Sequence, residues 1–175
     1  MTAEAFRLWN ELDNDTSRAL GVHDRLTNDT RWNRASAAAD AGDTAPALHL
    51  LPSVIEGRTI RHGADHPWTL ACRLEQARRT GRTGRTGEAL ALATTATTDI
   101  RQALGQDHEL APAGRHQQAQ WTARRAQPNN AREQFNTLVS ACEEAHGPNH
   151  PLTEHCKTHT TQPHPEIWHH ELPSR

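Results

Sequence analysis

One short string recurs along this chain at a fixed interval. GADHPWTL, which begins at Gly63, returns as GQDHELAP at Gly105 and as GPNHPLTE at Gly147. An earlier copy, GVHDRLTN, begins at Gly21 with its third and fourth letters exchanged, so successive copies begin 42 residues apart. A period of this length indicates an array of structural units, each of which buries its apolar side against the next.

The period is kept at other positions of the unit. Arginine stands ten residues after each of the first three glycines, and alanine stands fourteen residues after each of them. Agreement at several positions is hard to obtain by chance, so the repeat signal is strong. The recurring side chains are Arg31, Arg73, Arg115, Ala35, Ala77 and Ala119.

The letters of the recurring string predict where helices end and begin. Glycine adopts the left-handed backbone that closes a helix, and Asp65, Asp107 and Asn149 are residue types that cap the helix that follows. Pro67 and Pro151 suit a first helical turn, where a missing N–H costs little. No segment alternates polar and β-branched residues. Each unit is therefore predicted to be helix A, a tight turn, helix B and a short loop.

The sequence thus predicts eight helices and no strand. Pro52 is expected to kink the helix that contains it, and the glycines of GRTGRTG, beginning at Gly81, are expected to fray the turn there. The predicted helices span residues 3–20, 26–41, 45–61, 66–81, 87–104, 109–125, 129–146 and 151–161.

The repeats are expected to form one domain over residues 1–161. It consists of a half unit (1–20), three full units (21–62, 63–104 and 105–146) and a partial unit (147–161). Residues 162–175 are rich in His and Pro and are expected to be an irregular tail. Because the chain begins in mid-repeat, a fragment of a larger regulatory protein is one alternative interpretation.

This helix pair, with a small residue in each helix, a mid-unit glycine and an inter-unit G-x-D-H-P-x-T-L, resembles the tetratricopeptide repeat (TPR). More narrowly, it is similar to the 42-residue repeats of kinesin light chains and of bacterial TPR arrays. The resemblance covers about residues 3–161. It implies an all-α superhelix (a TPR-like solenoid) of about 3.5 helix pairs, which binds proteins or peptides in a concave groove lined mainly by helix A.

Helical periodicity divides helix A into a small-residue packing stripe and a neighbouring polar stripe that contains the recurring arginine. Stacking of the units should align this polar stripe as a ladder of Arg and amide groups, which suit carboxylates and peptide backbones. The alternative is that Arg31, Arg73 and Arg115 form salt bridges to adjacent helices. The candidate partner-binding residues are Arg31, Asn33, Arg34, Arg73, Gln76, Arg115, Gln118 and Trp121.

Composition argues against several other classes of protein. The net charge is −2, so no basic surface for nucleic acid is expected, and no apolar run approaches the roughly 20 residues that span a bilayer. Three cysteines do not suggest a disulfide framework, which favours a reducing, cytoplasmic location. No phosphate-binding loop and no nucleophile with an adjacent base is present, so neither an enzyme nor a cofactor is expected.

The predicted function is a non-catalytic adaptor that holds a protein or peptide, possibly an acidic one, in its groove. An uncapped end of the solenoid is a plausible homodimer surface. Metal binding is a further alternative. His62 with His66 and His146 with His150 have the spacing of metal-ligand pairs, and more histidines crowd the C-terminus. A specific metal site is nevertheless not predicted, because His66 and His150 belong to the recurring loop.

Overall fold

The computed structural model describes residues 3–125 and 128–161, and within these ranges it contains eight α-helices and no strand. No helix begins or ends more than one residue from its predicted position. The helices are α1 (Ala3–Leu20), α2 (Arg25–Asp40), α3 (Thr44–His62), α4 (Pro67–Arg82), α5 (Thr86–Leu104), α6 (Leu110–Arg124), α7 (Pro128–His146) and α8 (Pro151–Thr161).

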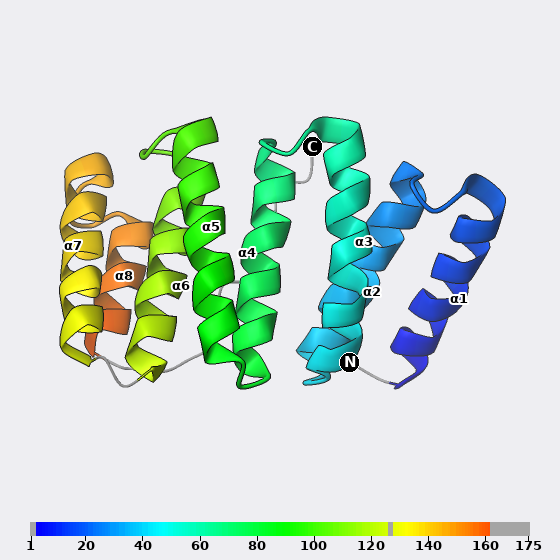
Figure 1. Ribbon diagram of the computed structural model, residues 1–175, viewed down its shortest axis with the longest axis horizontal. Coiled ribbons are helices and arrows are strands. Elements are labelled where there is room, and N and C mark those ends of the chain that lie inside the picture. The colour runs from blue at the N-terminus through cyan, green and yellow to red at the C-terminus, as the bar shows by residue number, and fades with distance from the viewer. Residues whose placement is uncertain (1–2, 126–127, 162–175) are drawn as a thin grey trace.

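The helices stack as an open array. Each packs against the helix before it and the helix after it, and α4 also contacts α6. Figure 1 shows them succeeding one another along the longest axis of the molecule, with α1 at one end and α7 and α8 at the other. The hydrophobic core is accordingly divided into small clusters between neighbouring helices. This is the all-α solenoid that the period predicted.

Glycines with positive φ mark the turns of the array. In each of them φ lies between 85° and 98°, a conformation that side chains with a Cβ rarely adopt. Four of them lie in inter-unit turns and two, Gly42 and Gly84, in mid-unit turns, and the predicted role of glycine as a helix terminator is confirmed. The residues are Gly21, Gly42, Gly63, Gly84, Gly105 and Gly147.

In the first two units the residue that caps helix A is the fourth letter of the recurring string, not the third, and in the third unit the helix begins after Glu109. His66 Nδ1 and His108 Nδ1 accept the amide N–H two residues further on, at 3.2 and 3.1 Å. In the first unit the carboxylate of Asp24 does the same at 2.8 Å. The prediction that Asp65 and Asp107 are the caps is therefore wrong. The exchange of letters in the first unit has a physical reason, because it keeps a hydrogen-bond acceptor at this position.

The threonine of the recurring string ties helix A to the glycine of the turn. Thr69 Oγ1 donates to the carbonyl of Gly63, and Thr153 Oγ1 donates to the carbonyl of Gly147, both at 2.9 Å. The third unit has Ala111 at this position and cannot make the bond. In the second and fourth units the motif therefore adds a local hydrogen bond within the turn between units.

One predicted irregularity lies inside a continuous helix, and the other lies at a turn between two helices. Pro52 is exposed within α3, which runs from Thr44 to His62 without a break, so the expected kink does not divide the helix. Gly81 and Arg82 belong to the last turn of α4, and α5 begins at Thr86, so the glycine-rich string forms only a short turn.

Candidate functional site

The polar stripe predicted on helix A lies largely between helices. Its first position (Thr27, Thr69, Ala111) and its last (Ala38, Thr80, Thr122) are buried in all three units. Only the two middle positions, which hold the arginines and the amides, reach the surface in part. The chemistry of this stripe therefore depends on what each middle side chain contacts.

In the first unit the arginine is fully engaged inside the protein. Arg31 Nε lies 3.0 Å from Asp13 Oδ1, and its terminal nitrogens donate to Ser17 Oγ and to the carbonyl of Val22, each at 3.0 Å. Arg34 binds the other oxygen of Asp13 at 2.8 Å, and its guanidinium lies over the ring of Phe6. The Asp13 side chain is only 7% exposed. One buried carboxylate thus joins α1 to two arginines of α2.

In the second unit the arginine pairs with the other neighbouring helix. Arg73 Nη1 lies 2.8 Å from Asp99 Oδ2 of α5, and both side chains are 28% exposed. The alternative interpretation of the arginine row, ion pairs to adjacent helices, therefore describes Arg31 and Arg73. Their role in binding a partner stays a prediction.

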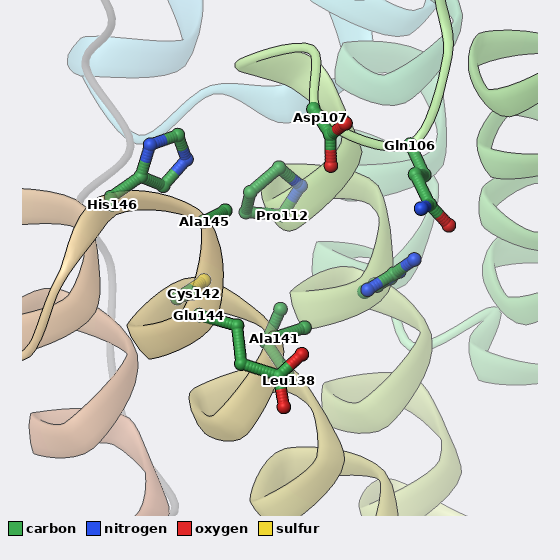
Figure 2. Close-up of a pocket in the computed structure, with 10 residues that line it drawn as sticks. Gln106, Asp107, Pro112, Leu138, Ala141, Cys142, Glu144, Ala145 and His146 are labelled. Carbon is green, nitrogen blue, oxygen red and sulfur yellow. The ribbon is translucent and has the colours of Figure 1, made fainter.

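The third arginine lines a cavity. Arg115 stands beside a space of about 520 Å³, which α6, α7 and the turn before α6 enclose in part. Pro112, Leu138 and Ala141 line the same space, as Figure 2 shows. Within residues 3–125 and 128–161, no carboxylate lies within the 4.0 Å ion-pair distance of Arg115.

The first unit also has a cavity beside its arginine. It measures about 550 Å³ and is lined by Arg31, Val22 and His23, with residues of α3 on the opposite side. Here the carboxylate of Asp13 is among the lining groups, and it holds the guanidinium. The two cavities differ in whether a lining carboxylate pairs with the arginine.

The remaining candidate residues are dispersed. Asn33 is exposed on α2, and Gln76 and Gln118 are half-buried on α4 and α6. Trp121 is 1% exposed and packs with Ala77 and neighbouring core residues. The expectation that Trp121 is available to bind a partner is wrong, because its ring is buried and fills the space above a glycine of α4, Gly81.

Sequence reasoning missed a charged cluster on α4. Arg78 makes two hydrogen bonds to the Glu75 carboxylate, at 2.7 and 2.8 Å, and Arg79 binds the same group. Burial disfavours ionisation of Glu75, but the hydrogen bonds and charges of Arg78 and Arg79 outweigh it and lower the pKa of the carboxyl. The i, i+3 and i, i+4 spacing of the three residues was the available signal.

The structure brings together one pair that sequence reasoning had noted, His62 with His66, and one that it had not, Cys142 with Cys156. The rings of His62 and His66 have centroids 4.7 Å apart. The thiols of Cys142 and Cys156 lie 3.6 Å apart and are buried, and burial raises the pKa of Cys156 to about 12. No group of three metal-ligating side chains occurs among the described residues. The histidine-rich tail lies outside those residues.

No helix in the described part of the chain is long and apolar enough to cross a membrane.

No protein-family model and no curated protein matches the chain. Solved structures do match it. Two crystal structures of nearly identical TPR-like repeats, named for a kinesin light chain of Podosopora anserina, superpose with TM-scores of 0.75 and 0.73. Each is 21% identical in sequence, and each match covers 91% of this chain and 77% of the other. Stacked helix pairs, glycine turns and these neighbours together identify the fold as a TPR-like α-solenoid.

Proposed function

We propose that this chain is a non-catalytic scaffold that binds a protein or peptide across the helix-A side of the solenoid. The observation that carries the proposal is the direct contact of α4 with α6 within a TPR-like stack. That contact brings helix A of one unit beside helix A of the next, so one partner can contact side chains of more than one unit.

The candidate residues divide into two groups under this proposal. Arg31, Arg34 and Arg73 are engaged in internal ion pairs, and they hold neighbouring helices together. The amides are available to a partner, since Asn33 is exposed and Gln76 and Gln118 are half-exposed. Amide groups both donate and accept hydrogen bonds, which suits a peptide backbone.

The test uses the intact chain as bait in a native lysate, with cross-linking and identification of the captured proteins. The triple variant Asn33→Ala, Gln76→Ala, Gln118→Ala should lose the specific partner without a change in melting temperature. A matched control on helix B of the second unit, Thr95→Ala with Gln102→Ala, also removes exposed polar groups and should keep the partner. Equal capture by both variants would contradict the proposed surface.

A second proposal concerns the first helix, which we infer to be a self-association surface. Leu8 and Leu12 are 52% and 43% exposed on successive turns of α1, and α1 packs only against α2 among the described helices. Leucines exposed on one face of a helix favour contact with a second copy. Sedimentation equilibrium should show a dimer that the Leu8→Ser, Leu12→Ser variant converts to a monomer. A concentration-independent monomer in the unaltered chain would exclude it.

The location of the chain is part of the first proposal. The three cysteines are buried free thiols, which suits a reducing compartment, and we place the scaffold in the cytoplasm on this ground.

A further inference from the structure

Three arginines occupy the same position in three consecutive units, and two of them have a carboxylate supplied by the protein. Arg31 receives Asp13 from the helix before it, and Arg73 receives Asp99 from the helix after it. Since the units repeat at 42 residues, the residues that would supply a carboxylate to Arg115 can be identified by position.

Neither neighbouring helix supplies an acid in the third unit. The position equivalent to Asp99 is Ala141, and the position equivalent to Asp13 is Thr97. Ala141 lines the same cavity as Arg115, and Thr97 donates its hydroxyl hydrogen bond to a carbonyl of its own helix. The guanidinium that is paired in the first two units thus borders an open space in the third.

The walls of this cavity restrict what can enter. Pro112, Leu138 and Cys142 give it an apolar wall, while Asp107 and Glu144 line it without pairing with Arg115. A volume of about 520 Å³ is within the range of small-ligand sites and too small for a helix. One carboxylate with an apolar neighbour fits this environment, whereas a run of acids would be repelled by the two acidic side chains.

We propose that the cavity between α6 and α7 is a carboxylate-binding subsite, in which a peptide places one carboxylate against Arg115 where Asp99 lies against Arg73. The carboxylate belongs to a glutamate or aspartate side chain or to the peptide C-terminus, and an apolar residue beside it packs on Pro112 and Leu138. This subsite deepens the proposed function, on which it rests for the class of ligand.

Physical chemistry favours such an occupant over a neutral one. A guanidinium forms two parallel charge-assisted hydrogen bonds with a carboxylate. The partly enclosed site strengthens them relative to the same bonds in open water.

The test titrates the full chain with three N-acetylated peptides and follows the backbone amides of α7 by nitrogen–proton NMR. The first is acetyl-Ala-Leu-Glu-Ala-amide, and the second is acetyl-Ala-Leu-Gln-Leu with a free C-terminus. The third, acetyl-Ala-Leu-Gln-Ala-amide, is neutral. The amides of Ala141 and Glu144 should shift with at least one charged peptide, at an affinity about tenfold or more above the neutral one. The stronger charged peptide identifies the source of the carboxylate.

Variants separate charge from volume. Arg115→Gln should weaken the charged peptide about tenfold or more. Ala141→Asp should do the same, because the new carboxylate reproduces the Arg73–Asp99 pair and occupies the guanidinium. Ala141→Asn fills nearly the same volume without charge, and it should retain most of the binding.

Several results would overturn the proposal. They are equal binding of charged and neutral peptides, unchanged affinity in Arg115→Gln, or equal losses in Ala141→Asp and Ala141→Asn. Failure here is distinguishable from failure of the proposed function. If the lysate partner binds the Arg115→Gln and Ala141→Asp variants as well as it binds the unaltered chain, the scaffold stands and the subsite is wrong.

Discussion

The second and third units share one backbone and differ in how their arginine is used. Both begin with a glycine of positive φ, and in both a histidine Nδ1 accepts a hydrogen bond from the first amide N–H of helix A. Yet Arg73 is held by Asp99, whereas Arg115 faces Ala141 across a cavity. The residue at this position of helix B is an aspartate that pairs with the arginine in the second unit and an alanine in the third.

Two other residues of the third unit also differ in their polar contacts from their equivalents in the second unit. Thr69 ties its helix to the preceding turn, while Ala111 cannot. Glu75 holds two arginines of α4, while the equivalent position on α6 is Gln117. At these two positions the third unit therefore lacks a polar contact that the second unit makes.

The largest expected effect comes from removing the most buried carboxylate of the arginine row. Asp13→Ala leaves Arg31 and Arg34 without their anion at a nearly buried site. It should lower the free energy of unfolding by about 3 kcal/mol, measured by urea denaturation. Asp15→Ala on the same helix removes an exposed carboxylate and should change it by less than about 0.5 kcal/mol. Equal effects would show that the Asp13 pair does not join α1 to α2.

A steric change at the junction of the two units comes next. A Cβ at Gly81 of α4 would lie 2.3 Å from the ring of Trp121 on α6. Gly81→Ala should therefore cost about 1–3 kcal/mol of stability by overpacking. Gly87→Ala is the control, because a Cβ there meets no atom closer than 4.0 Å and alanine favours the helix. The melting temperature of Gly81→Ala should be well below that of Gly87→Ala. The reverse order would show that Trp121 does not make this contact.

The Glu75 cluster should contribute a pH-dependent stability that the third unit lacks. Because the pKa of Glu75 is lower in the folded state, its contribution is fully present above the unfolded carboxyl value of about 4.3. It is lost as the pH falls through the lower folded value. Glu75→Gln should destabilise by about 1.5 kcal/mol at pH 7, and the difference should shrink below pH 4.3. Gln117→Glu is the comparison variant. It places a carboxylate at the equivalent position of α6, which has no arginine pair at the matching positions.

The repeat explains how much of the fold was predictable. Glycines at a constant interval fix turn positions through backbone conformation alone, so the helix ends followed from local chemistry. The cap was misassigned because Asp and His stand side by side, and only the backbone geometry shows which one faces the amide.

The candidate site was harder to predict, since it depends on contacts between distant residues. The sequence places Arg31, Arg73 and Arg115 in one row, but it does not show that Asp13 and Asp99 approach from opposite sides. Trp121 was misplaced for a related reason, because a glycine on the neighbouring helix makes room for its ring. Such pairings appear only when one helix is packed on another.

The most direct test exchanges the residues at two equivalent positions of helix B, Asp99 and Ala141. Asp99→Ala should lower the free energy of unfolding by about 0.5–1 kcal/mol, because the pair it breaks is partly exposed. Ala141→Asp should raise it by a similar amount, and the double variant should return close to the original stability in urea denaturation. If Ala141→Asp instead destabilises the chain as much as Asp99→Ala does, the two positions are not equivalent and the account of the arginine row is wrong.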